Sequence, residues 1–518
     1  MNISLANDIL KQLANVGVKE IALCPGARNS PLVTLLDSTQ TFKVFNFFDE
    51  RAAAFFALGR MRQTSQPLAL FTTSGTAAAE LLPGMVEAHY TGAPLIAVTA
   101  DRPRKCRGTG SPQSINQLKL FGEHVEHFLD LATNEFWNLD GWLKAGPLHL
   151  NVCFDEPLID EEIGSRQYAT SEFESGNILT QKKINEQREI FSEFLNKYKN
   201  PIFVLGGLHP SESSEIESFL KNTGALVFAE GLSNLRESTI LKNQILVSGD
   251  SLLNANNFDG LVRIGGVPTT RFWRDIENNP KMMPIISVSN LPFSGLSHGK
   301  LVHTNLQQFF SKFVCPVKSD SEKKATILMN DRARYREVMA LLDREPTSEP
   351  AMLHRLSLLI EKKSQIYLGN SSPIREWELF ATRENRSWEL FGQRGVNGID
   401  GQISSFLGYA HPKKPNWGIF GDLTAMYDLS APWILKQLEA KNIKIVVVNN
   451  GGGQIFSRMF TSKSFLNEHQ LQFQHWAKMW DLPWSRWEKI PNQFEESQPT
   501  VIELAPDRDA THRFWDSF

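Results

Sequence analysis

Short apolar runs alternate with helical patterns along most of the chain. In its first part the runs "EIALCPG", "FKVFNFF", "PLALFTT" and "PLIAVTADRP" are separated by segments such as "ERAAAFFALGRM", which reads as a helix. Strands that alternate with helices in this way form parallel sheets with helices on both faces. We therefore predict an α/β fold built from doubly wound parallel sheets.

The alternation occurs in three blocks, and the intervals between the blocks lack it. Apolar runs return at "PIFVLGG" and continue to "LVHTN", and a third block holds "SQIYLGNSS" and "IKIVVVNNGGGQIF". The intervals around 154–198 and at 318–327 are polar, and we interpret them as linkers. The pattern predicts three domains, at 1–175, 185–320 and 345–518. The sequence shows no fixed-period repeat and no low-complexity tract.

Composition narrows the class of protein. A net charge of −3, with 41% hydrophobic and 21% charged residues, is ordinary for a globular chain and gives no sign of nucleic acid binding. The four cysteines form no CxxC pair, which fits a reducing compartment. The amphipathic start "MNISLANDILKQL" does not resemble a signal peptide, and no apolar run approaches the roughly 20 residues of a membrane helix. We expect a cytoplasmic protein with no nucleic acid partner and no membrane span.

Polar residues follow two neighbouring strands of the third block. Asp422 ends the strand in "GIFGDL", and Asn449 and Asn450 end the next strand, before the glycine run 451–453. Ligands of parallel sheets bind beyond the carboxyl ends of the strands, so these side chains should converge on one point. A carboxylate, an amide oxygen and a backbone carbonyl suit Mg²⁺, and the glycines would let backbone approach a bulky anion. Alternatively, Asp422 caps a helix and the glycine run is only a turn.

This stretch resembles the signature of the thiamine diphosphate-dependent enzymes, although "GDL" stands where most of them have "GDG". Further stretches resemble the MenD family, the 2-succinyl-5-enolpyruvyl-6-hydroxy-3-cyclohexene-1-carboxylate synthases of menaquinone biosynthesis. They are "CPGARNSPL" at 24–32, "FDERAAAFFALG" at 48–59, "TSGTAAAELLPGMVEA" at 73–88, "TADRP" at 99–103, "GNSSPIR" at 369–375 and "RGVNGIDG" at 394–401. The resemblance covers the first and third blocks, and the middle block matches weakly. It implies a pyrimidine-binding domain over 1–175, a central domain over 185–320 and a diphosphate-binding domain over 345–518.

The resemblance implies an enzyme that binds thiamine diphosphate and Mg²⁺, with Mn²⁺ as the alternative ion. Such an enzyme decarboxylates 2-oxoglutarate and adds the succinyl-semialdehyde carbanion to isochorismate by 1,4-addition. The family also implies a homodimer or homotetramer with active sites at the subunit interface. Two alternatives stay open: another thiamine diphosphate-dependent 2-oxoacid decarboxylase or carboligase of the acetolactate synthase type, and a non-catalytic binding protein of the same fold.

The resemblance gives each matching residue a role. Metal coordination falls on Asp422, Asn450 and the Gly452 carbonyl, because the family's ligand is the Asn two before the coordinating Gly. Glu50 is the catalytic carboxyl, and Ile399 would wedge under the cofactor. The implied cofactor-binding residues are Pro25, Glu50, Gly75, Gln113, Ile399, Asp422, Leu423, Asn450 and Ile455. The implied substrate-binding residues are Arg28, Arg102, Gln113, Arg271, Ser371, Arg375, Arg394 and Phe456.

The residue types agree with this chemistry. Glu50 follows the apolar run "FKVFNFF", where desolvation would favour a protonated carboxyl able to share a proton with N1′ of the cofactor. Alternatively, Asp49 and Glu50 only complement the dipole of the following helix. The arginine guanidinium binds carboxylates in a bidentate fork, which suits substrates that carry several carboxylates, whereas a lone arginine is commonly a surface residue.

Two residues depart from the family pattern. Ala27 stands where the family usually has Ser in "PGSR", and Thr270 stands before Arg271 where Lys is frequent. Either change could weaken isochorismate binding or mark a different acceptor.

Overall fold

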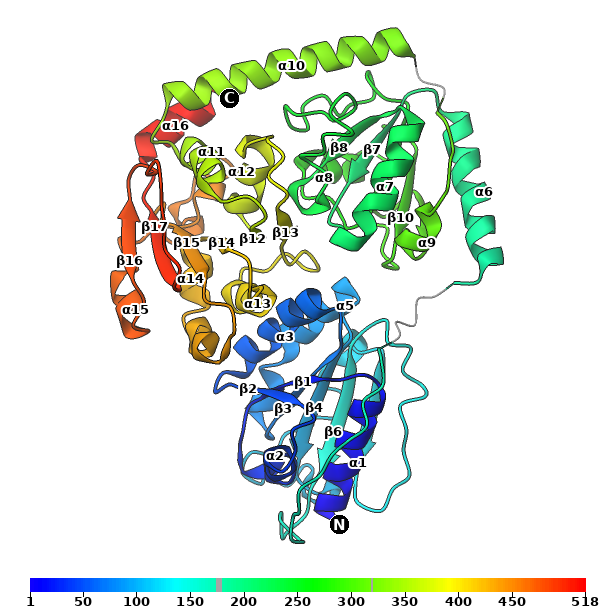
Figure 1. The fold of residues 1–518 in the computed structure, drawn as a ribbon, viewed down its shortest axis with the longest axis vertical. Coiled ribbons are helices and arrows are strands. Elements are labelled where there is room, and N and C mark those ends of the chain that lie inside the picture. The colour runs from blue at the N-terminus through cyan, green and yellow to red at the C-terminus, as the bar shows by residue number, and fades with distance from the viewer. Residues whose placement is uncertain (174–178, 318–319) are drawn as a thin grey trace. The chain divides into compact units, whose positions relative to one another are not determined.

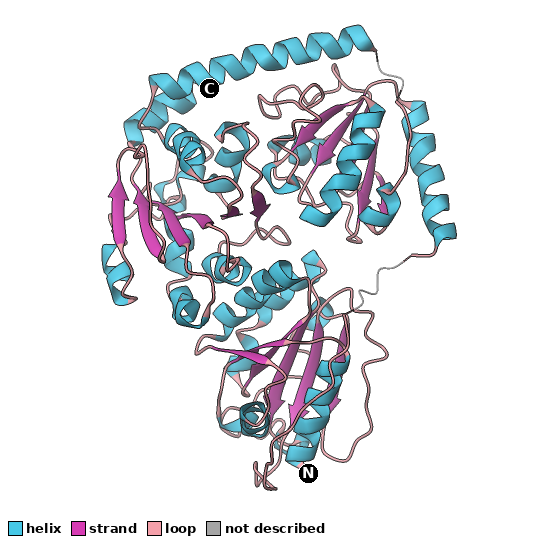
Figure 2. Cartoon of the chain, viewed as in Figure 1, coloured by secondary structure: helices cyan, strands magenta, loops and turns pink. Residues whose placement is uncertain are grey.

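The computed structural model describes residues 1–173, 179–317 and 320–518. It contains three sheets in which every strand pair is parallel, and helices cover them (Figures 1 and 2). The predicted α/β class with parallel sheets is therefore confirmed. The described residues pack as two compact units: the first sheet with 395–412 and 424–441 forms one, and the second and third sheets form the other.

The first sheet has the strand order β2-β1-β3-β4-β6-β5. Its strands are β1 (Glu20–Leu23), β2 (Lys43–Asn46), β3 (Leu68–Thr72), β4 (Leu95–Asp101), β5 (His127–Leu131) and β6 (Leu148–Cys153). Its helices are α1 (Asn2–Asn15), α2 (Ser30–Asp37), α3 (Glu50–Thr64), α4 (Thr76–Ala79) and α5 (Leu82–Thr91). The strands β3, β4 and β6 are buried throughout, because helices cover both faces of a parallel sheet.

Helix α13 (Gln402–Tyr409) belongs to this first unit, where it packs closely on α3. Two glycines make the approach possible. A Cβ on Gly59 would lie 1.8 Å from the Ser405 carbonyl oxygen, and a Cβ on Gly408 would lie 2.1 Å from the Phe56 carbonyl oxygen. The Ser405 hydroxyl also donates to the Phe55 carbonyl at 2.8 Å. Any side chain at these two glycines would therefore push the helices apart.

The second sheet has the order β11-β10-β9-β7-β8. Its strands are β7 (Pro201–Leu205), β8 (Leu226–Ala229), β9 (Gly260–Ile264), β10 (Ile285–Ser289) and β11 (Lys300–His303). The helices around it are α6 (Gln181–Lys197), α7 (Pro210–Thr223), α8 (Arg271–Asn278) and α9 (Leu306–Phe310).

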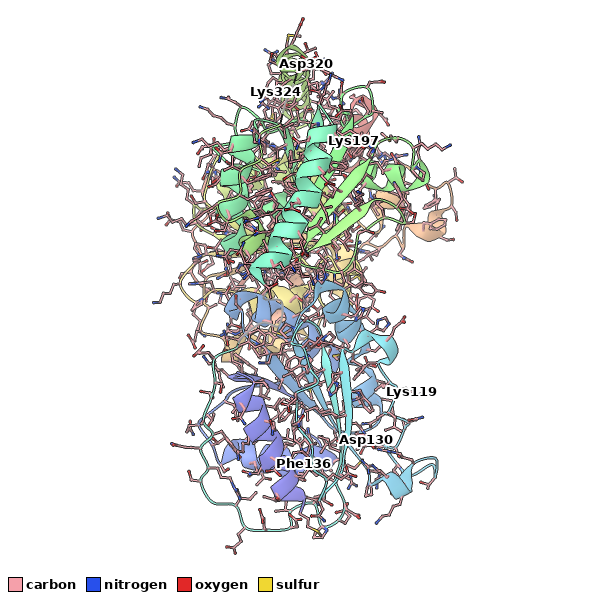
Figure 3. The ribbon with its side chains drawn as sticks, turned by 90° about the vertical axis from the view of Figure 1, so that its right-hand side faces the viewer. Lys119, Asp130, Phe136, Lys197, Asp320 and Lys324 are labelled. Atoms are coloured by element: carbon pink, nitrogen blue, oxygen red, sulfur yellow. The ribbon has the colours of Figure 1, made fainter. Side chains whose placement is uncertain are left out.

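Two intervals interpreted as linkers contain helix. Within 154–198, α6 buries Phe191, whose ring lies 5.5 Å from that of Phe309, so this part of the interval covers the second sheet. Within 318–327, the long helix α10 (Ser321–Arg344) has already begun. Asp320 caps it by accepting hydrogen bonds from the N–H groups of residues 322 and 323, and the Lys324 ammonium donates to the Gly224 carbonyl. Asp320 and Lys324 are labelled in Figure 3. The remaining linker residues 174–178 and 318–319 lie outside the described residues.

The third sheet has the order β13-β12-β14-β15-β17-β16. Its strands are β12 (Gln365–Leu368), β13 (Glu389–Phe391), β14 (Asn416–Gly421), β15 (Ile443–Val448), β16 (Trp484–Trp487) and β17 (Thr500–Leu504). The neighbouring helices are α11 (Glu349–Leu359), α12 (Ser372–Phe380), α14 (Asp422–Tyr427), α15 (Gln474–Met479) and α16 (Arg508–Ser517). Short 3-10 helices complete the chain: η1 (Ala27–Asn29), η2 (Arg104–Cys106), η3 (Gly122–His124), η4 (Gly231–Ser233), η5 (Ala431–Gln437), η6 (Gln454–Phe456) and η7 (Lys463–Phe465). Among the helices that the structure describes, none combines the length and apolar content needed to cross a membrane.

Candidate active site

The carboxyl ends of β14 and β15 bring the predicted metal ligands to one edge of the third sheet. These strands are direct neighbours, and Gly421 pairs in register with Val448. Asp422 and Asn449 are therefore the first residues beyond two adjacent strand ends, as the sequence predicts. The two positions lie at the edge where parallel sheets bind ligands.

The Asp422 carboxylate is buried and organises the glycine run. Its Oδ2 accepts hydrogen bonds from the N–H groups of Gly451 and Gly452, at 2.8 and 2.9 Å. Its Oδ1 accepts from the N–H of Leu423 at 2.6 Å, and the His469 Nε2 lies 3.3 Å from Oδ2. Burial raises the pKa of Asp422, although the surrounding N–H groups and His469 act in the opposite direction. Asp422 thus does cap backbone N–H groups, and it does so at a buried site that also suits a cation.

The two asparagines that follow β15 have different surroundings. Asn449 Nδ2 donates to the Leu471 carbonyl at 2.8 Å and to Glu503 Oε1 at 2.9 Å. Asn450 Nδ2 donates to Glu349 Oε2 at 2.8 Å. The Asn450 Oδ1 is buried and accepts no hydrogen bond from any residue that the structure describes. A buried amide oxygen without a donor is costly, and a cation would satisfy it.

The donor set fits a magnesium-type ion. Asp422 and Asn450 offer hard oxygen atoms, and Mg²⁺ takes few protein ligands because phosphate and water complete its octahedron. Within the described ranges, no group of three His, Cys, Asp or Glu side chains could hold a metal ion. The Gly452 carbonyl accepts the Gln454 N–H at 2.8 Å, and its second lone pair is left for a further partner.

The glycines at 451–453 are required by the backbone conformation and by the close packing of residues 466–468. Gly451 and Gly452 have φ of +81° and +131°, which disfavour other residues. A Cβ on Gly452 would lie 2.4 Å from the Leu466 carbonyl oxygen. The Gly453 N–H donates to the same carbonyl at 2.5 Å. The expected role of these glycines, close approach to an anion, is thus accompanied by close approach to residues 466–468.

Glu50 and Asp49 have separate roles in the first unit. Asp49 is the N-cap of α3, because its side chain accepts the Ala52 N–H at 3.0 Å. Glu50 is half-buried at the first position of the helix. Burial raises the pKa of Glu50, and the negative charges of Asp49 and Glu80 raise it further. Capping is therefore accounted for by Asp49, and Glu50 carries the raised pKa that a proton-sharing role requires.

The predicted residues of the pyrimidine-binding segment gather beyond β1, β3 and β4. Gly26, next to Pro25, lies so close to Thr73 that an added Cβ would be 2.6 Å from the Thr73 Cβ. Gly75 has φ of +83°, and its Cβ position lies 3.3 Å from the Gln113 Cα. The Gly75 N–H donates to Gln117 Oε1 at 3.0 Å. Sequence reasoning missed Gln117, because a polar residue in "SINQLK" gives no sign of burial.

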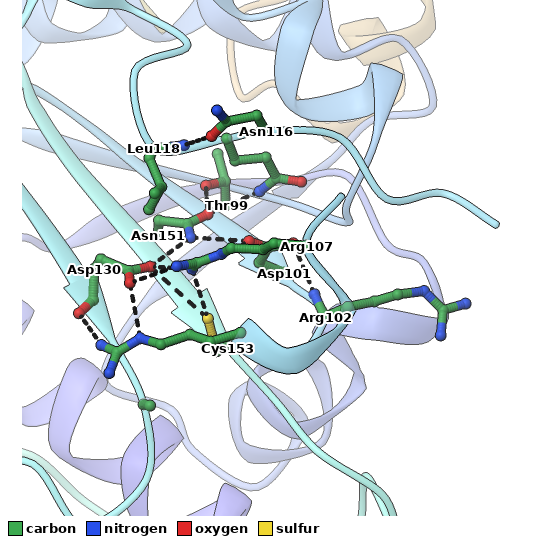
Figure 4. A network of polar contacts seen from close by, with 12 residues as sticks. Thr99, Asp101, Arg102, Arg107, Asn116, Leu118, Asp130, Asn151 and Cys153 are labelled. Carbon is green, nitrogen blue, oxygen red and sulfur yellow. Dashed lines mark hydrogen bonds and ion pairs between the residues drawn. The ribbon is translucent and has the colours of Figure 1, made fainter. Parts of the chain in front are cut away.

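Gln117 joins a buried polar network that includes Asn151 and Asp101, both labelled in Figure 4. Its Nε2 donates to Asn151 Oδ1 at 2.8 Å, and Asn151 Nδ2 donates to Asp101 Oδ2 at 3.1 Å. Asp101 Oδ1 accepts the Arg102 N–H at 2.8 Å. The network therefore links the Gly75 turn to the backbone of Arg102, a predicted substrate residue.

The predicted arginines of the first unit differ in availability. The Arg102 Nε donates to the Pro112 carbonyl at 2.8 Å, and its guanidinium points away from the Asp101–Asp130 network (Figure 4). Arg28 is buried, and its Nη1 donates to the Phe154 carbonyl at 3.2 Å and lies 3.1 Å from Glu156 Oε1. The Nη1 group of Arg28 is therefore already engaged by Glu156 and the Phe154 carbonyl.

The predicted substrate residues of the third sheet gather beyond β12. Ser371 is the N-cap of α12, with φ of +75°, and its carbonyl accepts Arg375 Nη1 at 2.7 Å. Arg394 Nη1 donates to Asn370 Oδ1 at 2.8 Å. Ser371 and Arg375, two of the predicted substrate residues, are therefore in contact through the Ser371 carbonyl.

The side chain of Arg271 contacts other residues than Ser371, Arg375 and Arg394 do. Its side chain is 78% exposed and pairs with Asp275 at 3.7 Å along α8. Burial, and then the charge of Arg274, lowers the pKa of Arg375, so Arg274 is the residue of α8 whose charge reaches that guanidinium. Position 274 was not among the predicted sites.

The remaining predicted residues lie on two segments. Ile399 belongs to the segment 395–401 of the first unit, whose start is fixed by the buried Glu87: Oε1 accepts the Gly395 N–H and Oε2 the Val396 N–H, both at 2.8 Å. A small pocket lined by Phe55, Val86 and Gly398 lies beside it.

Ile455 and Phe456 form η6 of the second unit. Phe456 is 37% exposed there, near the stacked rings of Phe460 and Phe465, whose centroids are 4.2 Å apart. These aromatic side chains form an apolar surface around Phe456, which is one of the predicted substrate residues.

Comparison with known proteins identifies the relatives of the chain. The family described as "Thiamine pyrophosphate enzyme, N-terminal TPP binding domain" matches residues 3–120. A 2-succinyl-5-enolpyruvyl-6-hydroxy-3-cyclohexene-1-carboxylate synthase of Bdellovibrio bacteriovorus is 42% identical over 525 residues, covering 100% of this chain and 98% of the relative. The protein of the same name from Akkermansia muciniphila is 36% identical, covering 98% and 97%. That from Bacillus pumilus is 29% identical, covering 92% and 89%.

Proposed function

The chain belongs to the family of 2-succinyl-5-enolpyruvyl-6-hydroxy-3-cyclohexene-1-carboxylate synthases, and we propose from this premise that it catalyses their reaction in menaquinone biosynthesis. In that reaction 2-oxoglutarate loses carbon dioxide, and its remaining four carbons are joined to isochorismate by 1,4-addition. The observation that carries the proposal is the placement of Asp422 and of an Asn450 Oδ1 without a donor among the described residues beyond two neighbouring strands, in a chain related to the synthases over its full length.

Thiamine diphosphate and Mg²⁺, or Mn²⁺ in its place, are the proposed cofactors. When bound, thiamine diphosphate supplies a carbon nucleophile and an electron sink. Asp422, Asn450 and the Gly452 carbonyl would hold the metal ion, and Leu423 and Ile455 would contact the cofactor. Pro25, Gly75, Gln113 and Ile399 complete the proposed cofactor contacts.

Glu50 is the proposed proton-holding carboxyl. Its pKa is raised, first by burial, which favours the protonated form of the carboxyl and so a proton that could be shared with a ring nitrogen of the cofactor. With thiamine diphosphate bound, the proton held by Glu50 would support activation of the cofactor, and the other proposed contacts would supply most of its affinity.

Arginine side chains would bind the substrate carboxylates. Arg375 and Arg394 lie beyond β12 with Asn370 and Ser371, where a guanidinium fork and polar groups suit the distal carboxylate of 2-oxoglutarate. Arg28, Arg102, Gln113, Arg271 and Phe456 are the other proposed substrate contacts. The extra carboxylates of these substrates distinguish them from pyruvate.

A homodimer or homotetramer with active sites at the interface is the proposed assembly. Exposed apolar side chains lie in the same unit as Glu50. Phe48, two residues before Glu50, is 58% exposed, and Trp433 is 44% exposed; their ring centroids are 5.0 Å apart. Tyr427 and Leu429 are 51% and 46% exposed in the same unit. Exposed apolar groups of this kind are typical of protein interfaces.

The three sheets support three domains with the bounds 1–175, 185–320 and 345–518, which we propose as pyrimidine-binding, central and diphosphate-binding domains.

The central test of the function measures carbon dioxide released from 2-oxoglutarate, with and without isochorismate, in the presence of thiamine diphosphate and Mg²⁺. We expect release that depends on 2-oxoglutarate and a new product that forms only with isochorismate. Equal use of pyruvate would favour a general 2-oxoacid decarboxylase, and no release from any 2-oxoacid would favour a binding protein.

A further inference from the structure

Two adjacent asparagines after β15 each donate to a different buried glutamate. Asn449 Nδ2 donates to Glu503 of β17 at 2.9 Å, and Asn450 Nδ2 donates to Glu349 of α11 at 2.8 Å. The two glutamates are 0% and 3% exposed. The pairs differ in what remains on the asparagine: only Asn450 leaves a buried Oδ1 without a donor among the described residues.

An asparagine amide presents an oxygen or an NH₂ group depending on a half-turn of its side chain. Only the oxygen can bind a cation, and only the NH₂ group can donate a hydrogen bond. In its ionised form the Glu349 carboxylate accepts hydrogen bonds and does not donate them, so it pairs with the NH₂ group and leaves the oxygen directed away from itself. We propose that Glu349 is a positioning residue that holds the Asn450 oxygen toward the divalent cation.

Glu349 is itself held in place. It is the first residue of α11, after the N-cap Ser348, whose side chain accepts the Ala351 N–H at 3.3 Å. The Glu349 N–H donates to the Thr511 hydroxyl of α16 at 3.0 Å. Its Oε1 is buried and has no hydrogen-bond partner within the described part of the chain. A carboxylate in such surroundings costs stability, so its presence is better explained by the orientation it gives Asn450 than by stabilisation of the fold.

This inference rests on the proposed function, because it assumes that a cation binds with thiamine diphosphate at Asp422 and Asn450. Residues that orient metal ligands commonly contribute tenfold or more to metal affinity. Replacing the carboxylate by an amide of the same shape lets position 349 donate to the Asn450 oxygen. That oxygen would then be turned from the cation in a large share of molecules.

The test measures Mn²⁺ affinity by the electron paramagnetic resonance signal of free Mn²⁺, at saturating thiamine diphosphate. We expect Glu349→Gln to raise the Kd for Mn²⁺ roughly tenfold over wild type. Glu349→Met, which offers no acceptor, carries the same expectation and provides the test should the amide variant not fold. Glu503→Gln is the matched control, since it changes the partner of Asn449 and should leave the Kd within twofold.

A second readout separates orientation from general stability. Because the buried carboxylate is costly, the cation-free Glu349→Gln chain should melt no lower than the wild type while it binds Mn²⁺ more weakly. A merely structural glutamate would lower the melting temperature. A rise in Kd of less than fivefold in the folded variant overturns the inference. Failure of the wild type to bind Mn²⁺ with thiamine diphosphate would instead contradict the proposed cofactor site.

Discussion

The buried carboxylate of Glu87 accepts the backbone N–H of Gly395 at 2.8 Å, although 308 residues separate the two in the chain. Its second oxygen accepts the next N–H, that of Val396, at the same distance. One glutamate of α5 therefore fixes the start of the segment that carries Ile399, the residue proposed to lie under the cofactor.

Glu87→Gln should weaken cofactor binding. An amide has one acceptor oxygen instead of two, so one N–H of the segment loses its partner, at a cost of roughly 1–3 kcal/mol. We expect about a tenfold rise in the Kd for thiamine diphosphate, measured by calorimetry in the presence of Mg²⁺. Glu162→Gln, at an exposed position of the same unit, is the control. An unchanged Kd in Glu87→Gln would show that the segment holds its position without this carboxylate.

Glu50→Gln should lower the reaction rate, whereas Asp49→Ala should mainly lower the stability of the fold. The amide at position 50 cannot share a proton in the same way, so decarboxylation should fall by orders of magnitude while thiamine diphosphate still binds. Asp49→Ala removes the cap of α3 and should cost about 1 kcal/mol of stability, with a much smaller effect on rate. Single-turnover rates and melting curves distinguish the two. A Glu50→Gln rate within a fewfold of wild type would leave that residue a role at the helix start only.

Cofactor binding should raise the melting temperature in a manner that depends on Asp422. A ligand that binds only the folded state stabilises it by about 2.7 kcal/mol at a hundredfold excess over Kd. Thiamine diphosphate with Mg²⁺ should therefore stabilise the wild type, and Asp422→Ala should nearly abolish the rise. Asn449→Ala should keep it, because Asn449 already uses its amide on Leu471 and Glu503. Equal rises in wild type and Asp422→Ala would place the metal elsewhere.

Arg375→Lys tests the binding of the distal carboxylate of 2-oxoglutarate. Lysine keeps the charge and loses the planar fork, so the KM for 2-oxoglutarate should rise tenfold or more, on the order of one lost charge-assisted hydrogen bond. Arg336→Lys, on the exposed side of α10, is the matched control and should leave KM unchanged. Steady-state kinetics with 2-oxoglutarate and with pyruvate measure both effects. Equal changes in the two variants would remove Arg375 from the substrate site.

Glu230 should make stability depend on pH. Burial, with the nearby charge of Glu378, raises the pKa of Glu230 to about 8, although its carboxylate accepts the Thr269 hydroxyl at 2.8 Å. A folded pKa above the unfolded value of 4.5 means that the folded chain binds more protons, so this group destabilises the fold increasingly as pH rises from 4.5 to about 8. The melting temperature of Glu230→Gln minus that of the wild type should therefore be larger at pH 8 than at pH 5. A difference between the two chains that is constant across this range would contradict the raised pKa.

The residues at the strand ends could be predicted from the sequence, whereas the buried polar side chains that support the site could not. The positions of Asp422 and Asn449 follow from the alternation of strands and helices, because parallel neighbours end at one edge. Glu87, Glu349 and Gln117 gave no signal, since a polar residue in a helical or loop pattern is ordinarily solvent-exposed. Only the tertiary packing reveals that they are buried and which backbone or side chain they hold.

Two other differences have physical causes. Helix α6 was read as linker because its polar residues outnumber its buried ones, although Ile184, Phe191 and Leu195 recur at helical spacing. The adjacent acids Asp49 and Glu50 could not be told apart from sequence, since either can serve a helix start. The cap contact assigns that task to Asp49, and the partial burial of Glu50 distinguishes the second acid.

The close packing of α3 on α13 sets the distance between these two helices in the first unit. Helix α3 begins with Glu50, and α13 begins directly after the segment of Ile399. At Gly59 and Gly408 the backbone of each helix lies directly against that of the other, so a side chain at either position would change their separation. The two glycines therefore also affect the spacing between Glu50, the proposed proton-holding carboxyl, and Ile399, the residue proposed to lie beneath the cofactor.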